Sequence, residues 1–205
     1  MKKVLVAMPN IGGIPPKTVA SLYQLLKAMK LPAVAFIESS LVYDARNSAI
    51  EQAVNEGFEE ILFIDSDLIF PDDAYEKLEA LDSDIATGVY YKRAGDHSPV
   101  VYREVKPSTD TESAEAKFFE TIPEGTFSVE GCGMGMCLIQ IEAIKKIYNN
   151  GCKLPFEPFD GLGEDLAFCY RARQIGLTIK ANSYIPLGHI GTAIYTKENY
   201  KGECK

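Results

Sequence analysis

The chain has 205 residues, and it contains no tryptophan, only two histidines and no long apolar stretch. A membrane-spanning helix needs about 20 consecutive apolar residues, and no run in this sequence approaches that length. The apolar run within residues 1–8 is also far shorter than the apolar region of a signal peptide. We therefore expect a cytoplasmic chain without a transmembrane segment.

Positive charge is scarce as well. The sequence has 21 Lys and Arg against 29 Asp and Glu, for a formal net charge of -8. Nucleic-acid-binding proteins usually carry a basic face that neutralises phosphates, so we expect no nucleic-acid partner. An acidic chain that binds a nucleotide diphosphate needs help with the charge, and a divalent cation is the obvious source of it.

Cysteine spacing excludes two further classes. The five cysteines are odd in number and include no Cys-x-x-Cys pair, whereas zinc ribbons and disulfide frameworks need paired spacings. Free thiols in a reducing compartment are the expected state. What the sequence does have is an ordinary globular composition, 46% hydrophobic and 24% charged, and we expect one domain over residues 1–205.

The first half of the chain alternates apolar runs with helical periodicity. We expect buried strands at residues 4–8, 33–37 and 61–64, and another strand over 84–91. Helices are predicted from Pro16, from Asp44 to Gly57 and from Pro71. This alternation favours an α/β fold, with a mostly parallel sheet, helices on both faces and ligands at the carboxyl ends of the strands.

The second half reads as shorter elements. We expect strands near 99–103 and 117–121 around a mobile polar loop, with no function assigned to residues 104–116. A strand then runs through Ile141, and a helix ends at Gly151. Another helix follows residues 163–165, with strands near 177–180 and 183–187. The tail after Ile194 is predicted to be a lid or an ill-ordered end.

Two carboxylates one residue apart, Asp65 and Asp67, follow an apolar strand. In an extended segment, side chains two positions apart project to the same side. Both carboxylates can therefore face one ligand, and Mg²⁺ or Mn²⁺ prefers such oxygen ligands together with substrate phosphates. The alternative is a plain turn at a strand end, where Asp is common.

Glu164 and Asp165 stand at the predicted start of a helix, after Gly163. A carboxylate here could act as a general base on an acceptor hydroxyl. The alternative is a structural role, since acidic side chains stabilise helix N-termini.

His189 lies between Gly188 and Gly191, just past a predicted strand. Glycines let the backbone come close to a ligand, and an imidazole would complete a metal site and favour Mn²⁺ over Mg²⁺. A lone histidine can equally be an ordinary polar residue. His97 lies in a polar turn and has no role assigned.

In this order, the Asp-x-Asp pair, the Gly-Glu-Asp triplet and the later histidine resemble the GT-A glycosyltransferases, particularly the family 2-like enzymes of bacteria and phages. The resemblance covers about residues 3–191. It implies a GT-A fold with a small antiparallel acceptor-side sheet, a nucleotide-binding half at 1–95, an acceptor and catalytic half at 96–195, and a tail at 196–205. It also implies a metal-dependent glycosyltransferase that moves a sugar from a nucleotide-sugar donor to an acceptor hydroxyl, by inversion.

The resemblance also implies roles for individual residues. Asp67 and His189 would bind Mn²⁺ or Mg²⁺, with Asp65 on the metal or the ribose. Asp165 would be the base, and Glu164 would bind hydroxyls. The remaining donor-binding residues would be Pro9 against the base, Arg46 on the nucleotide or its phosphates, Ser66, and the glycines Gly133 and Gly135 beside the sugar.

Little sequence follows His189, so either the acceptor is small or a partner supplies part of its site. Glycan, lipid-linked sugar, small molecule and protein acceptors all remain open, as do the donor and the oligomeric state. The alternative functions are a non-catalytic nucleotide-sugar-binding module and a Mg²⁺-dependent phosphatase of the haloacid dehalogenase type. That phosphatase normally carries its aspartate pair on the first strand. Sugar nucleotidyltransferases usually have a basic Gly-rich loop, which residues 9–13 lack.

Overall fold

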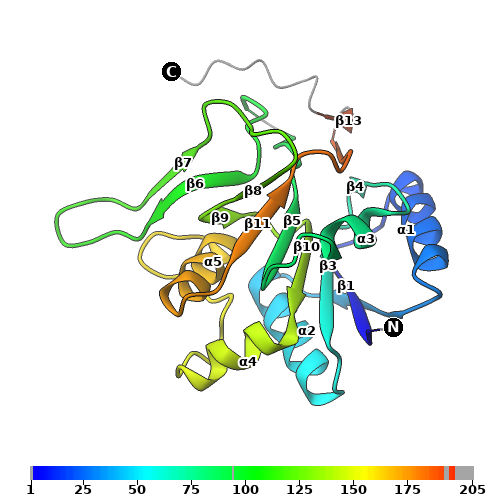
Figure 1. The fold of residues 1–205 in the computed structure, drawn as a ribbon, viewed down its shortest axis with the longest axis horizontal. Helices are drawn as coiled ribbons and strands as arrows, with labels where there is room; N and C mark the ends of the chain where they lie inside the picture. Colours follow the sequence, from blue (N-terminus) through cyan, green and yellow to red (C-terminus); the bar gives the residue numbers. More distant parts are fainter. Residues whose placement is uncertain (1, 94, 192–193, 197–205) are drawn as a thin grey trace.

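The computed structural model describes residues 2–93, 95–191 and 194–196. Within these residues, a seven-stranded sheet forms the centre of the molecule (Figure 1). Its strands, in spatial order, are β2 (Ala33–Glu38), β1 (Val4–Asn10), β3 (Glu60–Ile64), β10 (Met136–Gln140), β5 (Ile85–Gly88), β11 (Ile179–Asn182) and β8 (Thr126–Ser128). β10 runs antiparallel to β3 and β5, and β8 runs antiparallel to β11. The other pairs are parallel, as predicted.

Helices cover both faces of this sheet. They are α1 (Pro16–Ala28), α2 (Val42–Asn55), α3 (Ala74–Glu79), α4 (Ile141–Asn149) and α5 (Glu164–Gln174). Side chains from α2, α4 and α5 share one apolar cluster with Leu5 and Ala7, whereas side chains from α1 and α3 share another with Val6 and Met8. Successive residues of β1 therefore point into opposite layers, which explains why that strand is apolar throughout.

The predicted burial of the strand at residues 33–37 was wrong, because of its position in the sheet. β1 and β3 are buried as predicted, but β2 is not: its residues are exposed or half-buried, and Phe36 is 55% exposed. β2 is the edge strand and pairs only with β1. An apolar run alone does not tell an edge strand from a central one.

Two smaller antiparallel sheets flank the central one within the described residues, where the sequence predicted a single small sheet. One consists of β13 (Ile194–Tyr195), β12 (Gly188–Ile190) and β4 (Leu68–Ile69). The other consists of β7 (Glu115–Phe118), β6 (Val101–Lys106) and β9 (Gly131–Cys132). The β6–β7 hairpin extends away from the body of the molecule in Figure 1.

Several predicted boundaries were wrong. Residues 183–187 form no strand: they include Pro186, which has no N–H for a ladder, and the strand is β12, which carries His189. The third helix begins at Ala74 rather than Pro71, after a turn at residues 72–73. The strands β4 and β8 were not foreseen. Of the predicted tail, Ile194–Tyr195 pairs with β12, and residues 197–205 lie outside the described residues.

We find no helix in the described parts of the chain that is long and apolar enough to cross a membrane.

Candidate functional site

A cleft of about 610 Å³ lies at the carboxyl ends of β1 and β3. Its volume falls within the range of about 300–1,000 Å³ that is usual for small-molecule sites, and its position is the one expected for ligands of an open α/β sheet. Of the predicted site residues, the cleft is lined by Pro9, Asp65, Ser66, Asp67 and His189.

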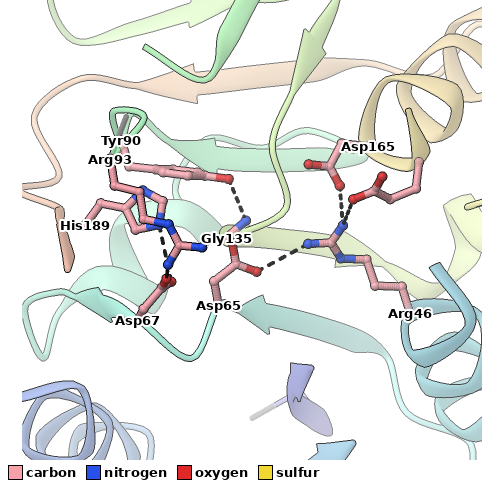
Figure 2. A network of polar contacts seen from close by, with 9 residues as sticks. Arg46, Asp65, Asp67, Tyr90, Arg93, Gly135, Asp165 and His189 are labelled. Atoms are coloured by element: carbon pink, nitrogen blue, oxygen red, sulfur yellow. Dashed lines mark hydrogen bonds and ion pairs between the residues drawn. The ribbon is translucent and has the colours of Figure 1, made fainter. Parts of the chain in front are cut away.

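Backbone pairing brings His189 to Asp67. β12 pairs antiparallel with β4, which places His189 opposite Leu68, and the Ile190 N–H donates to the Asp67 carbonyl at 2.8 Å. As a result, His189 Nε2 lies 3.3 Å from Asp67 Oδ1. Both side chains are mostly buried, with 12% and 20% of their surface exposed. Figure 2 shows the imidazole above the carboxylate.

The hydrogen bond of the other ring nitrogen, Nδ1, determines what can lie between His189 Nε2 and Asp67 Oδ1. His189 Nδ1 lies 2.9 Å from the Tyr91 carbonyl oxygen, which can only accept, so Nδ1 carries a hydrogen. In the neutral ring, the lone pair of Nε2 then faces a carboxylate oxygen, and two acceptors need a proton or a cation between them. Burial lowers the pKa of His189, but the hydrogen bond and the charge of Asp67 outweigh burial and raise it.

The spacing of these two atoms also suits a metal ion. Adjacent ligands on an octahedral ion at about 2.1 Å lie roughly 3 Å apart. A histidine whose second nitrogen donates to a carbonyl is the usual arrangement of a metal ligand. Asp67 and His189 therefore fit a divalent cation, with water and ligand oxygens completing the shell.

Arg93 contacts the second oxygen of the same carboxylate. Its Nη1 donates to Asp67 Oδ2, and 56% of the Arg93 side chain is exposed in the cleft. Burial raises the pKa of Asp67, but the hydrogen bond from His189 and the charges of His189 and Arg93 lower it below its usual value. Asp67 is therefore held ionised, as a metal ligand must be.

A second charged cluster lies beside the cleft, centred on Arg46 of α2. The Arg46 guanidinium donates to Glu164 Oε1 at 3.0 Å, to Asp165 Oδ1, and to Asp65 Oδ1 at 3.3 Å. Only 3% of the Arg46 side chain is exposed, because it lies on the buried face of α2 with Ala45 and Ala49. Figure 2 shows the guanidinium between Asp65 and Asp165.

One buried guanidinium cannot neutralise three carboxylates. Burial raises the pKa of Asp165, the charge of Arg46 lowers it, and the charges of Glu164 and Asp65 raise it, which puts it at about 7. Asp165 therefore exchanges a proton near neutral pH, the range in which a general base works best. About a quarter of its side chain remains exposed.

Tyr90 links the two clusters, and sequence reasoning missed it. Its hydroxyl accepts from the Gly135 N–H at 3.0 Å, and its ring lies edge-on to His189. A Cβ on Gly135 would come within 2.7 Å of Asp65 Oδ2, and one on Gly133 would meet Tyr90 and Val100. The two glycines thus make room for Tyr90 and Asp65, and their predicted contact with the sugar stays a prediction.

The structure does not bring all predicted ligands together. Asp65 directs Oδ1 to Arg46, and among the residues that the structure describes no three His, Cys, Asp or Glu form a metal-binding group. Arg46 does not line the cleft. Its contact with phosphates, and that of Asp65 with the metal or the ribose, remain predictions.

Solved structures of other proteins have a similar fold. The protein A197 from STIV superposes with a TM-score of 0.66 at 20% sequence identity, covering 92% of this chain and 86% of that chain. A structure of GalNAc-T7 with UDP, GalNAc and Mn²⁺ superposes with a TM-score of 0.61 at 11% identity, covering 98% of this chain and 45% of that chain. This chain thus spans less than half the length of the GalNAc-T7 chain.

At these identities, the likeness shows the fold alone. The sequence matches no protein-family model and no curated protein. The predicted α/β fold of the GT-A type, with a mostly parallel central sheet and a small antiparallel addition, is confirmed.

Proposed function

We propose that this chain is a divalent-metal-dependent glycosyltransferase that transfers a sugar from a nucleotide-sugar donor to a hydroxyl group. The observation that carries the proposal is the contact of 3.3 Å between Asp67 Oδ1 and His189 Nε2. This contact lies in the cleft at the carboxyl edge of the sheet, and its two atoms are spaced like two ligands of one cation. The similar fold of GalNAc-T7, solved with UDP and Mn²⁺, supports the same conclusion.

The donor would occupy the half of the chain formed by residues 1–95, because most residues that line the cleft come from it. Pro9 and Ser66 would contact the nucleotide, and Asp65 the ribose or the metal. When bound between Asp67 and His189, Mn²⁺ or Mg²⁺ would offset the negative charge that develops on the departing diphosphate. Tyr91 holds the His189 ring in the tautomer that leaves Nε2 available.

Asp165 would remove the proton from the acceptor hydroxyl. Its pKa of about 7 lets the carboxylate accept a proton under neutral conditions. Arg46 fixes the carboxyl by a direct ion pair and holds Glu164 beside it, where Glu164 can bind acceptor or donor hydroxyls. A base on the acceptor side implies direct displacement with inversion of the anomeric carbon, in the half formed by residues 96–195.

The test is a thermal-shift screen of the protein with Mn²⁺ and UDP-, GDP- and dTDP-sugars, with a CMP-sugar as the monophosphate comparison. We expect one diphosphate sugar to raise the melting temperature, because a ligand stabilises the state that binds it. The shift should disappear with EDTA and in Asp67→Asn. The variant Asp72→Asn removes an exposed carboxylate outside the cleft and is the matched control.

The donor identified in this way is then incubated with acceptor sugars, and the product is analysed by NMR. An inverted anomeric linkage is expected. Retention would remove Asp165 from the role of base, and the absence of any shift with all donors would contradict the proposed function.

A further inference from the structure

The positive charge within the cleft is concentrated in one side chain. Among the described residues that line it, Arg93 is the only Lys or Arg, whereas two aspartates, Asp65 and Asp67, line the same space. The diphosphate of a nucleotide sugar is an anion and would enter beside these carboxylates. A cation between Asp67 and His189 would neutralise part of that charge, and among the described residues that line the cleft Arg93 is the one basic side chain that can neutralise the rest.

Arg93 has unused hydrogen-bonding capacity. Nη1 contacts Asp67 Oδ2, but Nε and Nη2 have no hydrogen-bond partner within residues 2–93, 95–191 and 194–196. More than half of the side chain is exposed. A guanidinium presents its donors in a planar fork that matches two phosphate oxygens, so Arg93 can take an anion within the cleft, which Arg46 does not line.

The backbone around Arg93 is anchored, whereas more than half of its side chain is exposed. The Lys92 N–H donates to the Ser98 carbonyl at 3.0 Å, and the Val100 N–H donates to the Tyr90 carbonyl at 2.8 Å. These bonds close a hairpin-like loop that carries Arg93 near its tip. The long side chain can thus exchange one partner for another within the cleft without a change in the fold.

We propose that Arg93 is the phosphate-binding side chain of this cleft, and that it exchanges Asp67 Oδ2 for the donor diphosphate when a divalent cation binds at Asp67 and His189. This inference rests on the proposed function. In the free protein, Arg93 neutralises Asp67. With a cation beside Asp67, the two positive charges repel each other, and the diphosphate offers Arg93 a stronger partner.

Inorganic pyrophosphate probes this role without reference to the unknown base and sugar. We would measure its binding to the full chain by equilibrium dialysis at fixed free Mn²⁺, for wild type, Arg93→Gln and Lys92→Gln. Arg93→Gln should weaken binding about 10–100-fold, the usual effect of losing a hydrogen bond to a charged group. Lys92 is the matched control, because it lies over the Phe118 ring and does not line the cleft, and Lys92→Gln should change binding less than about 2-fold.

A second readout separates phosphate binding from support of the metal ligand. Titration with Mn²⁺ alone, followed by electron paramagnetic resonance, should show Arg93→Gln binding the ion at least as tightly as wild type, because Asp67 loses a competing cation. Weaker Mn²⁺ binding would mean that Arg93 only positions Asp67, and would overturn the inference.

The outcomes distinguish the inference from the proposed function. Wild-type binding of pyrophosphate with equal affinities for the Arg93 and Lys92 variants would overturn only the role of Arg93. Failure of wild type to bind pyrophosphate in the presence of Mn²⁺ would overturn both.

Discussion

The two arginines of the site carry the same functional group but differ in burial and in the number of carboxylates that they contact. Arg46 is 3% exposed and contacts Asp65, Glu164 and Asp165, whereas Arg93 is 56% exposed and contacts only Asp67 among the described residues. Figure 2 shows them on opposite sides of the Asp65–Asp67 segment. Arg46 comes from a helix packed on the sheet, and Arg93 from a loop that lines the cleft.

The difference in burial gives the two clusters different chemistry. Around the buried Arg46, partly exposed carboxylates outnumber the positive charge, so a proton is held on Asp165 near neutral pH. Around Asp67, the charges are nearly balanced and the groups face the cleft, so they can exchange partners with a ligand. The Arg46 cluster therefore suits proton transfer, and the Asp67 cluster suits ion binding.

Replacing the proposed base should give the largest effect. Asp165→Asn keeps the shape of the side chain but cannot accept the proton, so turnover of the donor identified by screening should fall about 10²–10⁴-fold. Donor affinity should stay near that of wild type, because the Asp67 cluster is intact. Asp160→Asn, an exposed change in the loop before α5, is the control. Full turnover in Asp165→Asn would exclude the base role.

The same substitution at the two arginines tests their difference directly. Arg46→Gln leaves three carboxylates facing each other without a guanidinium, and it should lower the free energy of unfolding by about 3 kcal/mol. Arg93→Gln should change it by less than about 0.5 kcal/mol, because exposed ion pairs contribute little. Urea denaturation at pH 7 measures both values. Equal losses would show that the two clusters do not differ as described.

A smaller substitution, at Gly135, tests how tightly the side chains between the two clusters are packed. Gly135→Ala would place a Cβ 2.7 Å from Asp65 Oδ2 and 2.8 Å from Tyr90 Cζ, so it should destabilise the fold by about 1–3 kcal/mol. Gly13→Ala also lies at the cleft but meets nothing within 4 Å, and should cost less than about 0.5 kcal/mol. Thermal unfolding of the two variants decides between crowding and a general intolerance of the cleft to substitution.

The pH dependence sharpens the comparison further. Below the Asp165 pKa of about 7 the base is protonated, so activity at saturating donor should rise with pH and level off above 7. The contribution of Asp165 to the stability of the fold changes with pH in the opposite direction to activity. A carboxyl whose pKa is raised on folding favours the folded state at low pH, and this contribution is lost as pH rises from about 4 to 7. Wild type should therefore lose stability relative to Asp165→Asn over that range, and parallel unfolding curves would contradict the raised pKa.

Much of this architecture could be predicted from local sequence. The apolar runs of β1 and β3 and the periodicity of α2 identified the parallel core, and the strand-end aspartates pointed to its carboxyl edge. The predictions that were wrong depended on contacts between segments that are far apart in the sequence. The exposure of β2 follows from its place at the sheet edge, and the strand that carries His189 follows from pairing with β4.

The site was predicted in part for the same reason. The residue types of Asp67 and His189 predicted that the two side chains meet, but the sequence placed His189 after a strand over 183–187, whereas it lies within β12, which pairs with β4. The burial of Arg46 among three acids was not predicted, because it requires α2 and the N-terminus of α5 to meet across 118 residues of sequence. Tyr90 carried no signal of its own beyond an aromatic pair at a strand end.

The central claim is that Asp67 and His189 together hold a divalent cation, and titration with Mn²⁺ followed by electron paramagnetic resonance tests it most directly. Wild type should bind one ion, and Asp67→Asn and His189→Gln should each weaken that binding by at least about 100-fold, since even indirect supports of metal ligands matter by 10–100-fold. Binding by both variants with the affinity of wild type would contradict the account.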